Sequence, residues 1–149
     1  MSQKPDVDMV TMSIIDSTMT SICREMGITL MKTSYSTIFN EALDFTCALA
    51  GPDGQMIAQA EFCPSMIGGV PLLVRSCVME IPLEEWEPGD VVVHNDPYRG
   101  GLHAPEHTLI QPVFVEGELM AFAMTIGHLA EIGGMVPGSF AVTASEVYQ

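Results

Sequence analysis

One stretch organises the chain, residues 88–134, which read PGDVVVHNDPYRGGLHAPEHTLIQPVFVEGELMAFAMTIGHLAEIGG and hold all four histidines. Residues 108–115 and 118–126 are strand-like runs on either side of a Glu116-Gly117 turn, a pattern that predicts a β-hairpin. The Val-Val-Val run at residues 91–93 predicts a buried strand just before it. The stretch therefore predicts strands of a sheet, with its polar side chains in the loops at the strand ends.

Those loops contain two similar patches. His103-Ala104-Pro105-Glu106 follows one Gly-Gly pair, and His128-Leu129-Ala130-Glu131 precedes another. A neutral imidazole nitrogen and a carboxylate oxygen are both good ligands for a divalent transition ion. The pattern favours a metal site built from two separate loops. The alternative is that these side chains cap turns or face solvent, as many histidines and acids at loop ends do.

Upstream, the sequence predicts two helices. Residues 6 to about 33 form a long amphipathic helix with Asp6 or Asp8 as its N-cap, because apolar residues recur every three or four positions. A shorter helix is expected over residues 70–80, with Pro71 in its first turn. The apolar positions of the long helix are Met12, Ile15, Met19, Ile22, Met26 and Leu30.

The remaining upstream residues predict a second hairpin. Residues 45–50 and 55–60 are short apolar runs around an Asp53-Gly54 turn. Residues 34–44 and 61–69 are expected to be connections, with Trp86 on the surface of the core. The predicted class is α+β: a long N-terminal helix and a shorter helix packed on antiparallel β-hairpins, with a metal site in the loops at the strand ends. Residues 1–149 read as one domain, incomplete without further chain.

Composition limits the partners. With 5 Lys and Arg against 19 Asp and Glu, the chain has a formal charge of -14, which repels nucleic acid and anionic lipid. No apolar run is long enough to span a membrane, so we expect a soluble, cytoplasmic protein. Since 48% of the residues are hydrophobic, part of the apolar surface is expected to meet another subunit or further chain.

The cysteines predict no disulfide framework. They are widely spaced, lie in apolar surroundings and form no C-x-x-C pair, so we expect buried free thiols. The four are Cys23, Cys47, Cys63 and Cys77.

Three other catalytic patterns are rejected. Residues 103–107 match H-x-x-E-H, but that metalloprotease signature needs both histidines on one helical face. Pro105 and the strand-like alternation after His107 argue against a helix, and an extended chain turns His107 away from the face of His103. The Gly-Gly pairs lack the Lys-Ser/Thr of a phosphate loop. No serine lies in a nucleophile elbow.

The chain closely resembles the hydantoinase B/oxoprolinase family over nearly all of its length and in the same order. The residues that carry the resemblance are Glu25-Met26-Gly27, Asp44-Phe45-Thr46-Cys47-Ala48-Leu49, Asp53-Gly54, Ala58-Gln59-Ala60, Pro88-Gly89-Asp90, Asn95-Asp96-Pro97-Tyr98-Arg99-Gly100-Gly101, His103, Glu106, Pro112-Val113-Phe114, Gly127-His128, Ile132-Gly133-Gly134 and Pro137-Gly138-Ser139.

The resemblance implies a subunit of an ATP-dependent enzyme complex. In this family a hydantoinase A-type partner binds ATP and phosphorylates the substrate, and the B-type subunit handles the activated intermediate at a metal site. Carried over by position, the metal ligands are Asp44, His103, Glu106 and His128. The expected ion is zinc, with manganese or iron as alternatives.

The expected metal gives roles to three further acidic residues, and the resemblance implies the partners. We expect Glu41, Asp96 or Glu131 to act as a base or to orient the histidines. The partners are the A-type subunit, the remainder of a B-type subunit and a small-molecule substrate.

Three functions stay open on sequence. The first is hydrolysis of a cyclic amide (hydantoin, 5-oxoproline or lactam type), the second is ketone carboxylation of the acetone or acetophenone type, and the third is an assembly role with a structural metal. Three positions depart from the family pattern, which usually has aspartate at Glu106 and at Glu131 and commonly has histidine at Met66. Glutamate for aspartate keeps the charge on a longer side chain and points to a different metal or metal geometry. Losing an imidazole at Met66 points to a divergent substrate or a reduced catalytic role.

Overall fold

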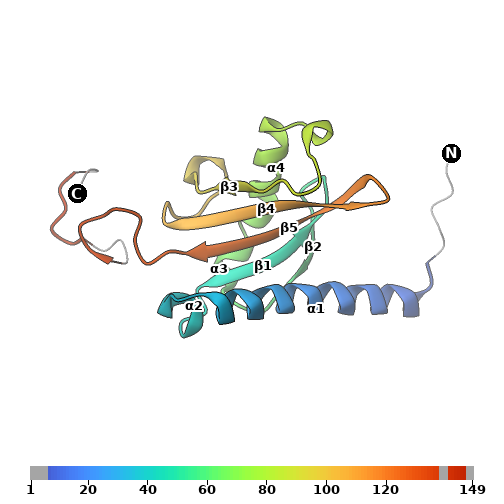
Figure 1. Ribbon diagram of the computed structural model, residues 1–149, viewed down its shortest axis with the longest axis horizontal. Coiled ribbons are helices and arrows are strands. Elements are labelled where there is room, and N and C mark those ends of the chain that lie inside the picture. Colours follow the sequence, from blue (N-terminus) through green and yellow to red (C-terminus); the bar gives the residue numbers. More distant parts are fainter. Residues whose placement is uncertain (1–6, 138–140, 147–149) are drawn as a thin grey trace.

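An antiparallel five-stranded sheet with strand order β2-β1-β5-β4-β3 lies at the centre of this computed structural model (Figure 1). The structure describes residues 7–137 and 141–146. The strands are β1 (Phe45–Ala50), β2 (Met56–Gln59), β3 (Val92–His94), β4 (Glu106–Val115) and β5 (Glu118–His128). The β4–β5 turn residues Glu116 and Gly117 both have positive φ, 51° and 85°, as a two-residue hairpin turn requires.

Helix α1 (Met9–Thr33) covers one face of the sheet, over β1 and β2. Asp8 caps it by accepting hydrogen bonds from the backbone N–H groups of Val10 (2.9 Å) and Thr11 (3.0 Å), so the predicted cap is confirmed; the alternative cap Asp6 lies outside the described residues. Hydrogen bonds from the Thr11 backbone N–H, the Thr11 hydroxyl and the Val10 N–H hold the pKa of the Asp8 carboxyl below its usual value. The core on this side contains Cys23, Phe39, Phe45, Cys47, Leu49, Ala58 and Ala60.

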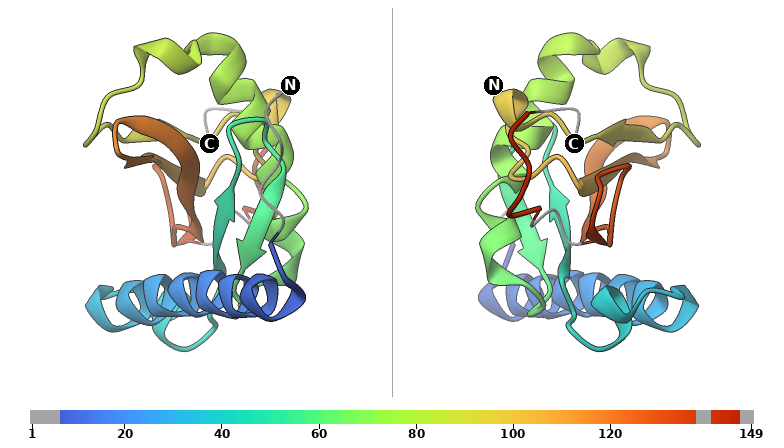
Figure 2. Two further views of the ribbon diagram at one scale, coloured as in Figure 1. Left: turned by 90° about the vertical axis from the view of Figure 1, so that its right-hand side faces the viewer. Right: turned by 90° about the vertical axis from the view of Figure 1, so that its left-hand side faces the viewer.

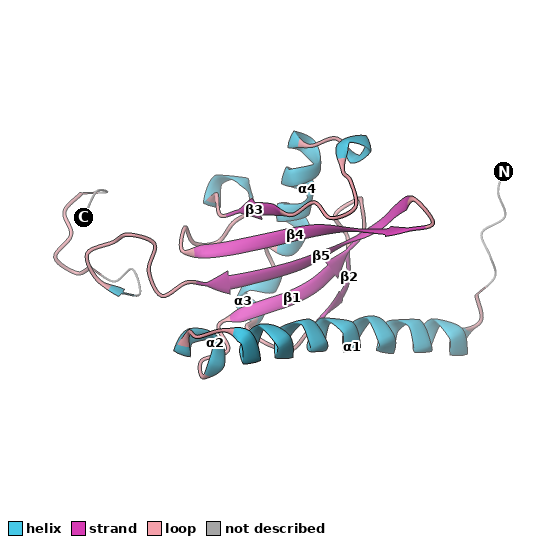
Figure 3. Cartoon of the chain, in the orientation of Figure 1, coloured by secondary structure: helices cyan, strands magenta, loops and turns pink. Residues whose placement is uncertain are grey.

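Helix α4 (Val70–Glu80) lies on the other side of the sheet from α1 (Figure 2). Its apolar stripe packs with Trp86 and with the inward-facing residues of β1, β4 and β5. This second core contains Ala48, Ala50, Met66, Val70, Leu73, Val74, Cys77, Trp86, Ile110, Phe122, Met124 and Ile126. The separation of helix and strand elements around one antiparallel sheet confirms the predicted α+β class (Figure 3).

The structure corrects several sequence-based details. Two expected connections contain the short helices α2 (Thr37–Asn40) and α3 (Pro64–Ile67), and single 3₁₀ turns form at η1 (Leu83–Glu85) and η2 (Pro97–Arg99). These elements are too short to show a helical periodicity. Trp86 is a core residue, not a surface one: it packs against Phe122, and its indole N–H donates to the Ile81 carbonyl at 3.1 Å. The Gly138-Ser139 part of the family pattern lies outside the described residues.

Much apolar surface remains exposed. The side chains of Met9, Val10 and Ile14 on α1 are more than half exposed. On the sheet, Val93 and Leu109 are cross-strand partners on the half of the α1 face that α1 does not cover. Contiguous exposed apolar groups of this kind mark interaction surfaces. Within the described residues, no helix has the length and apolarity needed to cross a bilayer.

The thiols give a direct test of the core. All four cysteines are free, and Cys23, Cys47 and Cys77 are buried, whereas Cys63 is half-buried. Burial raises the pKa of Cys47 to about 12 and that of Cys77 to about 11, so both stay protonated at pH 8, where the thiolate is the reactive form. We expect Cys63 alone to react rapidly with a disulfide reagent at pH 8, and all four thiols after denaturation. Rapid reaction of a second thiol in the native protein would contradict this packing.

Candidate metal centre

The β4–β5 register brings Glu106 and His128 together. They are directly opposite each other, as the first residue of β4 and the last residue of β5. Side chains of directly opposed residues lie on the same face of a sheet. That face is the one covered by α4, because Ile110 and Met124 farther along the same two strands belong to the α4 core. The pair therefore lies at the end of a buried face, where the sheet meets the loops.

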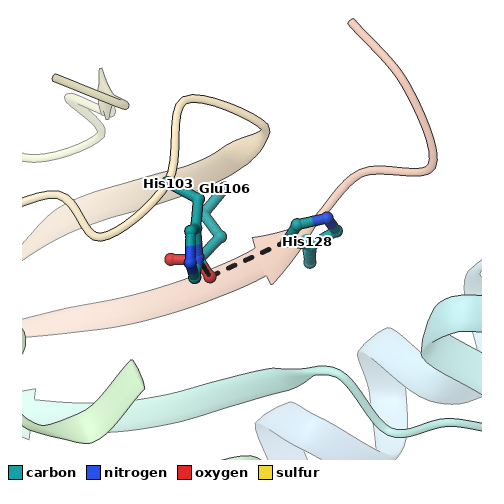
Figure 4. A group of neighbouring side chains, drawn as sticks. All are labelled: His103, Glu106 and His128. Atoms are coloured by element: carbon teal, nitrogen blue, oxygen red, sulfur yellow. Dashed lines mark hydrogen bonds and ion pairs between the residues drawn. The ribbon is translucent and has the colours of Figure 1, made fainter. Parts of the chain in front are cut away.

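His103 joins this pair from the loop before β4. The Glu106 N–H donates to the His103 carbonyl at 3.0 Å, and the resulting turn directs the His103 ring back onto Glu106. His103 Nδ1 contacts Glu106 Oε1, and His128 Nδ1 lies 3.7 Å from the same oxygen (Figure 4). The two imidazole rings are 5.9 Å apart between centroids. Two imidazoles, one from the loop before β4 and one from the end of β5, thus approach one oxygen of the Glu106 carboxylate.

The loop that carries His103 is tied to its surroundings at several points. Asp96 accepts the Tyr98 N–H at 2.9 Å through its side chain and the Gly101 N–H at 3.0 Å through its carbonyl. The Asn95 side-chain amide donates to the Ala104 carbonyl at 2.8 Å. Arg99 forms an ion pair with Glu80 of α4. These contacts attach the loop to α4 and to itself, so the His103 backbone is positioned before any ligand arrives.

The donor set fits a divalent cation. His103, Glu106 and His128 each offer one ligand atom, and these three atoms lie within 4.8 Å of one another. For comparison, atoms bound to the same zinc ion at about 2 Å lie roughly 3–4 Å apart. Glu106 is 4% exposed, and its Oε2 is buried with no hydrogen-bond partner in the described part of the chain. A buried carboxylate needs a compensating charge. A bound cation would supply that charge, and the two neighbouring imidazoles are suitable ligands for a transition-metal ion.

Asp44, the fourth predicted ligand, lies beside this group but is not part of it. Its carbonyl accepts the His128 N–H at 3.1 Å, one position beyond the Phe45–Gly127 pair of the β1–β5 ladder. Strand alternation from Phe45, which faces α1, puts the Asp44 side chain on the same face as His128. Its carboxylate lies outside the three-residue group. Its role as a ligand stays a prediction.

The three residues predicted to act as a base or to orient the histidines have local structural contacts. Glu41 is exposed at the C-terminal end of α2. Asp96 caps η2 and lies 3.5 Å from Arg99. Glu131 Oε1 accepts the N–H groups of Ile132 and Gly134, both at 2.7 Å. None of the three belongs to the His-Glu-His group, so their roles also stay predictions.

A further histidine, His94, lies on the same face and has no role predicted from the sequence. His94 ends β3 opposite Thr108, and both of its ring nitrogens are buried without a hydrogen-bond partner among residues 7–137 and 141–146. The strand alternation of Val92, Val93 and His94 could have placed it on the buried face. Only the β3–β4 register shows that it lies near Glu106.

Comparison with known proteins is consistent across sequence and structure. Residues 8–149 match the model of the hydantoinase B/oxoprolinase family. The chain is 40% identical over 146 residues to 5-oxoprolinase 1 of Arabidopsis thaliana, covering 95% of this chain and 11% of that protein. It is 37% identical over 142 residues to caprolactamase subunit beta of Pseudomonas jessenii, covering 95% of this chain and 24% of that one. The chain thus spans well under a third of the length of either relative.

The structural comparison agrees. The crystal structure of the ATP-dependent caprolactamase from Pseudomonas jessenii superimposes with a TM-score of 0.72 at 36% identity, over 89% of this chain and 23% of the other.

Proposed function

Since the chain belongs to the hydantoinase B/oxoprolinase family, we propose that it supplies the metal-binding part of an ATP-dependent hydrolase that opens a cyclic amide of the hydantoin, 5-oxoproline or lactam type. The observation that carries this proposal is the grouping of His103, Glu106 and His128 at the end of a buried sheet face, with both imidazoles directed at Glu106 Oε1. Relatives named 5-oxoprolinase and caprolactamase subunit beta support the substrate class.

The three proposed ligands differ in burial, and their roles at the site follow from it. Glu106 is buried and supplies the negative charge, while His128 holds the inner side of the group with its side chain 18% exposed. The His103 side chain is 62% exposed, so the group has one side open to solvent. A divalent ion bound there would act as a Lewis acid on a carbonyl and lower the pKa of its water.

That open side favours a catalytic site over a purely structural one. Structural zinc sites are closed by four protein ligands, whereas catalytic sites keep a position for water or substrate. The group here contains three protein donors. The substrate approaches the metal from the exposed side, past His103. If Asp44 is a fourth ligand, a closed site becomes possible. Coordination number is therefore a direct discriminator between the two roles.

The proposed partners are a hydantoinase A-type subunit that binds ATP and phosphorylates the substrate, and the remainder of a B-type subunit. Two observations support them. The relative in Pseudomonas jessenii is named as a subunit, and large apolar side chains of α1 and β3 are exposed, among them Met9, Val10 and Val93. Large apolar side chains that are exposed in one chain are typical of surfaces that become buried when a partner binds.

The test is co-purification followed by a turnover assay. The chain is isolated with its partners, the partners are identified by mass, and ATP hydrolysis is measured with lactams, hydantoins and 5-oxoproline, and separately with ketones plus bicarbonate. We expect ATP turnover that requires a cyclic amide and is lost on removal of the metal by a chelator. Turnover that requires a ketone and bicarbonate would show a carboxylase, and undiminished turnover without metal would show that the reaction needs no metal at this site.

A further inference from the structure

His94 is a partly buried histidine whose two ring nitrogens make no hydrogen bond within the described residues. Both ring nitrogens are inaccessible to solvent and have no hydrogen-bond partner among the described residues. A neutral imidazole carries one donor and one acceptor, and leaving a buried polar group unpaired destabilises the folded state. Two such groups on one side chain in the protein interior need an explanation.

The position of His94 suggests what it contacts. Val92 of the same strand packs against the α4 core, and strand alternation puts His94 on that same face. His94 is opposite Thr108, and Glu106 is two residues from Thr108 along β4. His94 and Glu106 are therefore diagonal neighbours on one face, a relation in which Cα atoms lie about 7–8 Å apart and long side chains come within reach.

Glu106 presents the complementary group. Its Oε1 faces the two histidines of the metal centre, whereas its Oε2 is buried and has no hydrogen-bond partner in the described residues. An unused donor and an unused acceptor on diagonal positions can be satisfied together by one enclosed water. Buried waters commonly occupy such polar sites, with about three hydrogen bonds each.

We propose that His94 is a positioning residue of the metal centre, which holds Glu106 Oε2 through an enclosed water and so keeps Oε1 directed at His103 and His128. This inference rests on the metal site of the proposed function. Carboxylates that bind metals are themselves hydrogen-bonded, and the loss of such a partner typically weakens metal binding about 10- to 100-fold.

His94→Phe is the informative variant, because it keeps the ring and removes both nitrogens. The affinity for Zn²⁺ is measured by competition with a chromogenic chelator on the protein purified with its partners, beside thermal unfolding of the metal-free form. We expect affinity to fall about 10- to 100-fold, with little change in the melting temperature of the metal-free form, since the phenyl ring keeps the shape and packing of the imidazole. A purely structural role would lower the melting temperature and leave affinity unchanged.

Two further variants complete the test. His94→Gln keeps a donor and an acceptor at this position, and we expect it to recover most of the affinity. His107→Phe is the matched control, because His107 neighbours Glu106 in sequence, is half-buried and lies on the opposite face of β4. The affinity of this variant for Zn²⁺ should differ from that of the unchanged protein by less than about 3-fold. The visible absorption of bound Co²⁺ should change in His94→Phe and not in His107→Phe.

The outcomes separate this inference from the proposed function. If the unchanged protein binds neither Zn²⁺ nor Co²⁺, the metal site itself is refuted. If it binds them and His94→Phe binds them equally well, or if His107→Phe is as defective as His94→Phe, the role of His94 is refuted. If His94→Phe fails to fold, the comparison of His94→Gln with His94→Ala decides, because only the first retains hydrogen-bonding groups; equal affinity in these two would overturn the inference.

Discussion

Replacing His128 with alanine is expected to abolish stoichiometric metal binding and the activity of the assembled complex while leaving the fold intact. His128 Nδ1 lies 3.7 Å from Glu106 Oε1 and forms the inner side of the donor group. The variant leaves one imidazole and one carboxylate, and the affinity loss should exceed the roughly 100-fold effect of removing a residue that only orients a ligand. His103→Ala should behave alike, because its Nδ1 contacts the same oxygen.

The measurement is metal content per chain after dialysis, with circular dichroism to confirm the fold. The matched control is His107→Ala, since His107 is next to Glu106 but on the other face of β4, and it should keep its full metal content. Full metal content in both His103→Ala and His128→Ala would refute the assignment of these residues as ligands. Loss of metal in the control as well would show that the loop had simply been disturbed.

Gly100→Ala is expected to give the largest loss of stability among the glycine positions near the site. Gly100 ends the η2 turn with φ of +100°, a conformation that strains any residue with a Cβ. A Cβ at this position would also lie 2.9 Å from backbone atoms of Leu72 and Leu73 in α4. The backbone cannot yield as a flexible side chain would. We expect a packing cost of about 1–3 kcal/mol in addition to the conformational strain.

Gly89→Ala separates these two contributions. Gly89 has a φ of +99°, and a Cβ there would meet nothing within 4 Å, so this variant reports the strain alone, about 1 kcal/mol or more. Both variants are compared by denaturant unfolding at constant metal. Gly100→Ala should be the less stable of the two, and it should also bind metal more weakly because the same loop carries His103. Equal stabilities would mean that the loop does not pack on α4 as closely as the structure shows.

The identity of residue 106 bears on the role proposed for His94. The family resemblance implies aspartate at this position, and this chain has glutamate. In the structure the longer side chain reaches His103 Nδ1 from the first residue of β4, while its second oxygen turns into the buried face of the sheet. In the role proposed above, His94 positions this second oxygen, Oε2. The presence of glutamate instead of aspartate at residue 106 is thereby linked to the role of His94.

Several features could be predicted because they depend on local spacing. The 3.6-residue period of α1, the Asp53-Gly54 and Glu116-Gly117 turns and the free thiols all follow from residues close together in sequence. The two His-Glu patches, read from residue types and spacing, already pointed to His103, Glu106 and His128, which the structure brings together, and the family resemblance added Asp44. The short helices α2 and α3 escaped prediction because four residues are too few to show a period.

Other features depended on strand register, which no local pattern specifies. On sequence the two His-Glu patches look equivalent, yet His128 faces Glu106 across the β4–β5 ladder, whereas Glu131 binds backbone N–H groups of its own loop. His94 looked like an ordinary strand residue until its pairing with Thr108 placed it diagonal to Glu106. The sequence alone thus determined the elements and the residue types capable of holding a cation. The tertiary structure decided which of them meet, because a one-residue shift in pairing would turn every side chain of a strand to the opposite face.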